Sequence, residues 1–289
     1  MNYKPAVRAM TALAVMALAP LSASRAQLSN DDAPIVVSHF QLNVTSVPDH
    51  LNFWVDTLGG EALTLWDGST GVRFPDVILV LHEQPPTGPT LGTTFDHIGF
   101  ATPDVPALAA KAVANGYQRT VGREPGPGQD ESPPTAGNYG RFEYLVGPDG
   151  VKVELVTAMD EDAPPIAFHH AHFVNRQFVE MGRWYMKAFN ATEREGATDY
   201  FFGADLPGVG YMLNFFSWLP AQDLVGTAGR AVDHVGFDVR GLEAFCAELE
   251  AKGIELTVPY HREYGIGWAR LVDPWGTVLE LSEGLRDRY

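Results

Sequence analysis

A short phrase that occurs twice constrains this chain more than any other feature. Residues 95–100 read FDHIGF and residues 232–237 read VDHVGF; each leads to a closing segment, GPDGVKVEL at 147–155 and DPWGTVLEL at 273–281. Weaker copies of the opening phrase begin at Ser38 and His169. Self-similarity of this kind indicates a fold assembled from repeated supersecondary units. We therefore expect four such units.

Residue spacing predicts the same order of elements in each unit. Residues 35–44 alternate as a strand does, residues 47–58 have apolar side chains at helical spacing, and residues 77–82 form a buried apolar run. Further helices are expected at 105–115, 180–189 and 242–252, each between strands.

Two irregular segments interrupt this pattern. The acidic and Pro-rich segment 159–166 is the expected linker between an N-terminal domain, 35–158, and a C-terminal domain, 167–284. The segment 122–138 is rich in Gly, Pro and acidic residues and is too polar for the core. It is either a lid over a binding site or a flexible insertion.

The first 26 residues are predicted to be a signal peptide. Lys4 and Arg8 precede the apolar run 9–21, and small residues at Ser24 and Ala26 suit a signal peptidase. The alternative is an apolar N-terminal helix of the fold. The run is too short for a membrane span, which needs about 20 residues. The mature protein is thus expected to be periplasmic or secreted.

Charge narrows the possible partners. The formal net charge is −16, and removal of residues 1–26 would take it to about −19. Such acidity argues against nucleic acid or an anionic membrane as a partner and leaves a small-molecule substrate. The chain has one cysteine, Cys246, so no internal disulfide can stabilise it.

The repeated unit resembles the vicinal oxygen chelate (VOC) superfamily. The resemblance rests on the opening Asp-His-x-Gly-Phe and on the closing Asp-Pro-x-Gly-x-x-x-Glu. This superfamily includes glyoxalase I, type I extradiol dioxygenases and the bleomycin resistance proteins. The resemblance implies an α+β fold in which four βαβββ modules form two tandem VOC (glyoxalase-like) domains.

The resemblance also implies metal ligands on the opening and closing strands. Two histidines and one carboxylate would hold a divalent ion and leave coordination positions open for substrate oxygens or O₂. Fe(II) is favoured, with Zn, Mn or Ni as alternatives. His172 lies on the same strand face as His170 and could substitute for it. The expected ligands are His39, His97 and Glu154 in the N-terminal domain, and His170, His234 and Glu280 in the C-terminal domain.

Catalytic residues are implied in the same way. Tyr144 matches a tyrosine that dioxygenases carry ten residues before the final ligand, and His82 could supply an acid–base group in that domain. In the C-terminal domain His261 matches a dioxygenase histidine, while Arg270 replaces the tyrosine and could grip a carboxylate or an enolate. These residues could instead have purely structural roles: His82 at a strand end, Tyr144 in hairpin packing and Arg270 as an exposed hairpin side chain.

A fourth ligand typical of glyoxalases is not evident. The closing strand of the first unit has Leu79 and Leu81 where it would be expected, and the third unit has residues 212–214, Met-Leu-Asn. This puts glyoxalase I itself in doubt.

Three functions therefore stay open. The favoured one is an exported Fe(II) dioxygenase that binds its substrate through two vicinal oxygens. The second is a glyoxalase- or epimerase-like isomerase or lyase, and the third is a resistance-type binding protein. We expect one active site per chain, with the C-terminal domain favoured, in a monomer or a homodimer.

Overall fold

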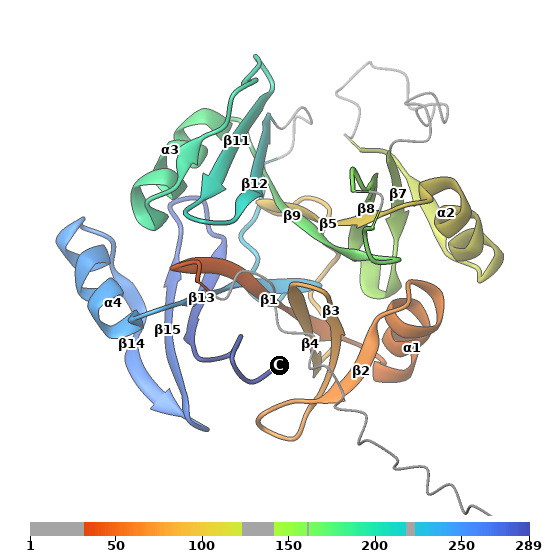
Figure 1. Cartoon of the computed structure of the whole chain (residues 1–289), viewed down its shortest axis with the longest axis horizontal. Coiled ribbons are helices and arrows are strands. Elements are labelled where there is room, and N and C mark those ends of the chain that lie inside the picture. The colour runs from red at the N-terminus through yellow and green to blue at the C-terminus, as the bar shows by residue number, and fades with distance from the viewer. Residues whose placement is uncertain (1–31, 123–141, 161, 218–222) are drawn as a thin grey trace, which may run out of the picture.

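The computed structural model describes residues 32–122, 142–160, 162–217 and 223–289, and it contains four βαβββ units in succession (Figure 1). This confirms the expected α+β fold of four βαβββ modules. The predicted signal peptide and nearly all of segment 122–138 lie outside the described residues. No helix in the described part of the chain is long and apolar enough to span a membrane.

The two N-terminal units have matching layouts. The first consists of β1 (Ile35–Val44), α1 (Val47–Leu51), the π-helical η1 (Asn52–Thr57), β2 (Glu61–Thr64), β3 (Thr70–Phe74) and β4 (Val77–Glu83). The second consists of β5 (Phe95–Thr102), α2 (Val105–Ala114), β6 (Gln118–Thr120), β7 (Phe142–Val146), the 3₁₀ turn η2 (Pro148–Gly150) and β8 (Lys152–Thr157).

The two C-terminal units repeat this order. The third consists of β9 (Ala167–Asn175), α3 (Phe178–Phe189), β10 (Thr192–Glu193), β11 (Phe201–Leu206) and β12 (Gly210–Ser217). The fourth consists of β13 (Val232–Val239), α4 (Leu242–Ala251), β14 (Leu256–Glu263), β15 (Ile266–Val272) and β16 (Val278–Glu283).

Each of the two eight-stranded sheets takes strands from both halves of the sequence. Units one and four form a sheet of order β14-β15-β16-β13-β1-β4-β3-β2, which we call the 1–4 sheet. Units two and three form a sheet of order β10-β11-β12-β9-β5-β8-β7-β6, the 2–3 sheet. The opening strands join them, since β1 pairs antiparallel with β13 and β5 with β9.

The helices, in contrast, pair within each half, as Figure 1 shows with α1 and α2 on one side and α3 and α4 on the other. The rings of Phe53 in η1 and Tyr117 after α2 lie 4.6 Å apart, and those of Phe189 in α3 and Phe245 in α4 lie 6.2 Å apart. The domain boundaries at 158 and 167 stay a prediction, and each sheet bridges them.

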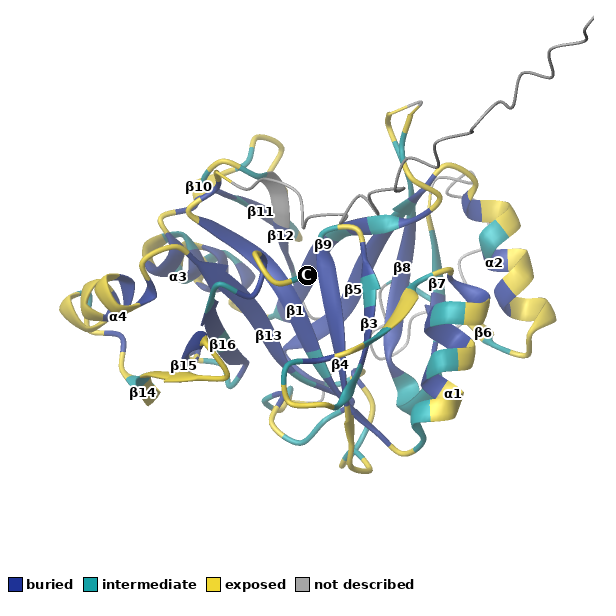
Figure 2. Cartoon of the chain, turned by 60° about the horizontal axis from the view of Figure 1, so that its bottom comes forward, coloured by how far each residue is buried: buried dark blue, intermediate teal, exposed yellow. Residues whose placement is uncertain are grey.

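Strand alternation separates the core from the ligand faces. Phe40, next to His39, points into the interior between the sheets, where its ring lies 5.5 Å from that of Phe95 and 5.7 Å from that of Phe168. Figure 2 shows the central strands buried, while the edge strand β14 and the outer faces of the helices are exposed. The histidine positions therefore lie on the sheet faces turned away from this shared core.

A buried ion pair fastens the C-terminal segment to the 1–4 sheet. Arg286 Nε lies 2.6 Å from Asp238 Oδ1, and both side chains are almost wholly buried. The same guanidinium donates to the carbonyl oxygens of Ala33 and Asp238, at 2.7 and 2.6 Å. Its hydrogen bonds thus join the start of β1, the end of β13 and the C-terminus.

Replacing Asp238 with Ala should lower the free energy of unfolding by ~3–5 kcal/mol, because Arg286 would keep a buried charge without its partner. Urea unfolding followed by circular dichroism would measure the loss. The double variant Asp238→Ala/Arg286→Met should be more stable than the single one. Equal stability of the two would show that the isolated charge is not the cause.

Candidate metal centre

The glycine of each Asp-His-x-Gly-Phe phrase makes room for a histidine from the neighbouring strand. Gly99 lies opposite His170, and Gly236 lies opposite His39. A Cβ atom at Gly99 would lie 2.2 Å from His170 Cε1, and one at Gly236 would lie 2.0 Å from His39 Cε1. Only glycine allows an imidazole to lie this close to the opposite strand.

Each of the four opening-strand histidines is held at Nδ1 by the side chain directly before it. An imidazole fixed at one nitrogen presents the other in a defined direction, which is how proteins commonly orient metal-binding histidines. The Nδ1 distances are 3.0 Å for Ser38 and His39, 2.6 Å for Asp96 and His97, 2.8 Å for His169 and His170, and 2.9 Å for Asp233 and His234.

Four residues of the 2–3 sheet form what we call the 2–3 cluster: His97, Glu154, His170 and the neighbouring His172. Donor atoms of the first three converge on one point. Glu154 Oε2 lies 2.9 Å from the Nε2 atoms of both His97 and His170, and these two nitrogens lie 3.2 Å apart. His172 brings a further nitrogen, and one ligand atom from each of the four residues lies within 4.8 Å of the others. All four residues are buried.

The charge balance of this cluster favours a cation. Burial raises the pKa of Glu154, but hydrogen bonds from His170 and His97 outweigh it and hold the pKa well below its usual range. Burial lowers the pKa of His97, and hydrogen bonds to Asp96 and Glu154 more than offset this, so that the pKa is raised. An ionised carboxylate faced by imidazole nitrogens attracts a proton or a metal ion to the space between them.

Two further side chains fix the cluster. Tyr144 Oη donates to Glu154 Oε1 at 2.6 Å, so that Oε2 faces the imidazoles. The buried Lys152 Nζ lies 2.9 Å from Asp96 Oδ2. Burial raises the pKa of Asp96, but the charge of Lys152 and the hydrogen bond with His97 lower it by more. The net pKa is therefore below the usual value, and this carboxylate stays ionised.

His172 is the one cluster member whose ring has no hydrogen-bond partner in the described part of the chain. Neither Nδ1 nor Nε2 is bonded, although the residue is only 2% exposed. Burial, together with the nearby His97 and His170, holds its pKa well below the usual value, so the ring is neutral. An unbonded buried polar group costs roughly 1–3 kcal/mol, and such a group needs an explanation. A donor set of neutral imidazoles and one carboxylate, with this unsatisfied nitrogen beside it, fits a divalent metal ion.

The 1–4 sheet carries a looser cluster of His39, His234 and Glu280. Glu280 Oε1 lies 3.1 Å from His39 Nε2 and 3.5 Å from His234 Nε2. Its second oxygen lies 2.5 Å from Arg270 Nη2. Arg270 pairs with Glu280 in the same register as Tyr144 with Glu154. A guanidinium charge thus stands where the 2–3 cluster has a neutral phenol, and it opposes the binding of a cation.

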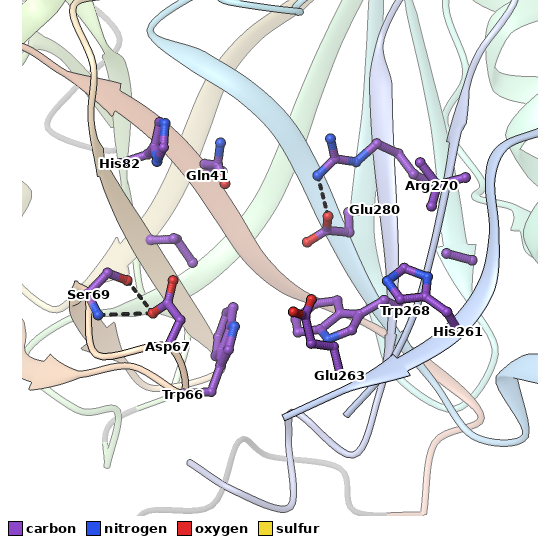
Figure 3. A pocket seen from close by; sticks show the side chains of 13 residues that line it. Gln41, Trp66, Asp67, Ser69, His82, His261, Glu263, Trp268, Arg270 and Glu280 are labelled. Atoms are coloured by element: carbon purple, nitrogen blue, oxygen red, sulfur yellow. Dashed lines mark hydrogen bonds and ion pairs between the residues drawn. The ribbon is translucent and has the colours of Figure 1, made fainter. Parts of the chain in front are cut away.

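Beside the 1–4 cluster lies a cavity of about 330 Å³ (Figure 3). Glu280 and Arg270 line it, together with Gln41, Trp66 and Trp268. His82 and His261 also line it, from opposite sides (Figure 3).

Most of the N-terminal half of the chain matches one protein family. Residues 36–155 match the sequence profile of the Glyoxalase/Bleomycin resistance protein/Dioxygenase superfamily. The chain contains a domain of this superfamily. No curated protein sequence matches the chain.

Solved structures of similar fold cover both halves of the chain. Glyoxalase I from Zea mays is 19% identical, with a TM-score of 0.61 over 88% of this chain and 94% of that one. A candidate dioxygenase from Bacillus subtilis is 13% identical, with a TM-score of 0.62 over 86% and 84% of the two chains. The CppA protein of Streptococcus pneumoniae is 11% identical, with a TM-score of 0.50 over 87% and 100%. At these identities the likeness is one of fold.

The expected grouping of the ligands is wrong in one respect. His39 was expected with His97 and Glu154, and His170 with His234 and Glu280. The two clusters instead exchange His39 and His170 between the halves, because β1 pairs with β13 and β5 pairs with β9. Each cluster thus combines ligands from both halves of the sequence.

The expected partners of His82 are corrected for the same reason. His82 was assigned to the site of Tyr144, but it lies on β4, which pairs with β1 in the 1–4 sheet, and it lines the same cavity as His261 and Arg270. Tyr144 does contact Glu154, as its position implied.

The residues that position the ligands had no role predicted from the sequence. Asp96 and Asp233 orient the next histidine, and Gly99 and Gly236 admit the opposite one. The repeat itself contained the signal, because the Asp and the Gly recur in both strong copies of the phrase.

Substituting Ala for Gly99 should displace His170 and weaken Co(II) binding to the 2–3 cluster by about tenfold or more, since a clash of this kind costs ~1–3 kcal/mol. Histidine ring signals in proton NMR would locate the change. The matched variant Gly236→Ala should move His39 signals and leave those of His170 in place. Unchanged His170 signals in Gly99→Ala would contradict the cross-strand explanation.

Proposed function

We propose that the chain is a metal-dependent enzyme of the non-haem Fe(II) dioxygenase type, with its centre at the 2–3 cluster. The supporting observation is the triangle of His97 Nε2, His170 Nε2 and Glu154 Oε2, with sides of 2.9, 2.9 and 3.2 Å. Donor atoms about 2.1 Å from one ion and at right angles to each other lie ~3.0 Å apart. The triangle therefore suits three adjacent corners of an octahedron, the facial arrangement of two His and one carboxylate that non-haem Fe(II) oxygenases use.

When bound, the ion would act as a Lewis acid toward two vicinal oxygens of the substrate and, as Fe(II), would supply reactivity toward O₂. The chain's own residues orient the ligands. Tyr144 fixes the Glu154 carboxylate, and Asp96, held by Lys152, fixes the tautomer and direction of His97. The substrate class we propose is a small molecule with vicinal oxygens on a flat or apolar body.

One metal site per chain follows from the difference between the clusters. In the 1–4 cluster the guanidinium of Arg270 already occupies Glu280, whereas Tyr144 leaves Glu154 with its negative charge. We thus propose that the metal ion binds at the cluster of Glu154. This replaces the expectation, based on the closing motif at 273–281, that the active site lies in the C-terminal domain. Each cluster is complete within one chain, so a monomer suffices, and a homodimer is the alternative.

Elemental analysis after anaerobic Fe(II) loading tests the proposal. We expect about one ion per chain in the wild type, its loss in Glu154→Ala, and its retention in the matched variant Glu280→Ala, because a metal site depends on its carboxylate ligand. Uptake of O₂ with a panel of catechols should follow the same pattern.

The other outcomes separate the competing functions. Metal held through Glu154 without O₂ uptake would instead support an isomerase or lyase. The absence of metal in the wild type would sink both enzyme proposals and favour a binding protein.

We also propose that the protein is exported. Support comes from the basic residues Lys4 and Arg8, the apolar run 9–21 and the small residues before Gln27. N-terminal sequencing of the protein from a Gram-negative host's periplasm should begin at Gln27. Substituting Arg for Ala26 should block this processing, and a mature protein that still begins at Met1 would argue against export.

A further inference from the structure

We propose that His172 is a fourth protein ligand of the metal ion in the 2–3 cluster, so that the site has three imidazoles and one carboxylate. This deepens the proposed function and rests on it: with four protein ligands an octahedral ion would keep two open positions, enough for two substrate oxygens or for one of them and O₂.

Sheet register defines equivalent positions in the four units. In the 1–4 sheet, His39 lies opposite Gly236, and Gln41 lies opposite His234. In the 2–3 sheet, His170 lies opposite Gly99, and His172 lies opposite His97. His172 and Gln41 thus stand where the two strong phrases have glycine.

The closing strands place one residue beside each of these positions. Glu280 lies beside Gly236, and Glu154 lies beside Gly99. The remaining two places hold Val80 beside Gln41, and Asn214 beside His172. Neither sheet therefore has a second carboxylate at these positions of its closing strands.

Asn214 does not offer its oxygen to an ion. Arg194 Nη1 donates to Asn214 Oδ1 at 3.0 Å, and the cationic guanidinium also binds Asp205. A carbonyl oxygen bonded to a guanidinium is a poor ligand for a further cation. The closing strand of the third unit thus leaves its ligand place unfilled.

His172 offers the cluster a further donor nitrogen, whereas the oxygen of Asn214 is already bonded to Arg194. Its ring centre lies 4.3 Å from that of His97 and 5.5 Å from that of His170, and both its nitrogens lack a partner among the described residues. Its ligand atom lies within 4.8 Å of those of the triad. Two ligands of one ion lie at most ~4.2 Å apart, so ligation by His172 would require its ring to move toward the triad.

A packing role would need only the ring. Phe216 lies 4.2 Å from His172 between ring centres, and an aromatic side chain of similar size would preserve that contact. His172→Phe therefore separates ligation from packing, and His172→Gln provides a second, smaller polar replacement. Circular dichroism of both variants without metal would confirm folding.

Co(II) is the probe, because its visible absorption reports the number and type of its ligands. All variants carry Glu280→Ala, so that binding to the 1–4 cluster does not contribute. In this background His172→Phe and His172→Gln should bind Co(II) about tenfold to a hundredfold more weakly and shift its absorption bands. The matched control is Gln41→Ala, at the equivalent place in the other sheet, which should change neither affinity nor spectrum.

The two proposals fail in different ways. Unchanged affinity and spectrum in His172→Phe, with binding lost in Glu154→Ala, would overturn the fourth ligand alone. Lack of Co(II) binding in the background chain, or binding that survives Glu154→Ala, would overturn the proposed metal centre and this inference with it.

Discussion

The antiparallel pairing of opening strands is the constraint on which both clusters depend. The pairing of β5 with β9 sets Gly99 opposite His170, and the pairing of β1 with β13 sets Gly236 opposite His39. A shift of one residue in either register would turn the histidines into the core, because successive side chains of a strand point to opposite faces. Register, glycine and ligand geometry are thus one feature. It explains why the phrase repeats as a block.

The two clusters share a backbone plan and differ in a few side chains. Tyr144 and Arg270 occupy one pair of equivalent places, and His172 and Gln41 occupy another. In each pair the 2–3 sheet has the residue that suits a cation better, either a neutral donor or an extra nitrogen. The 1–4 sheet instead has a cavity lined by Arg270 and Glu280, in which the guanidinium neutralises the carboxylate. Duplication of a unit followed by changes at single positions can separate a metal centre from a pocket without altering the fold.

Most of the fold could be predicted from the sequence because its signals are local. The change from strand spacing to helical spacing recurs in every unit, and the helices 105–114 and 242–251 lie within a residue of their expected bounds. The π-helical turn at Asn52–Thr57 and the exposed strand Leu256–Glu263 were not foreseen. Neither leaves a distinct periodic pattern: the first keeps helical spacing, and the second has almost no buried side chains.

The residues of the candidate site could be predicted from the sequence but their grouping could not, and their role as metal ligands stays a prediction. All six expected ligands belong to a cluster, because each lies in a copy of the repeat. Which copies meet depends on strand pairing over long sequence separations, such as Gln41 with His234, and no local pattern records it. The superfamily resemblance supported ligand positions within a unit, and we extended it to pairs of adjacent units. The sheets pair the outer two and the inner two units instead.

This crossed pairing has a thermodynamic consequence for the metal. His97 and Glu154 come from the N-terminal half, and His170 and His172 come from the C-terminal half. An ion held by all of them binds only when β5 and β9 are paired, so its binding free energy adds to the stability of that pairing. The helices contact each other within each half, whereas the sheets and their ligand clusters join the halves. A metal ion at the proposed centre would therefore also cross-link the halves, in a chain whose single cysteine rules out an internal disulfide for that role.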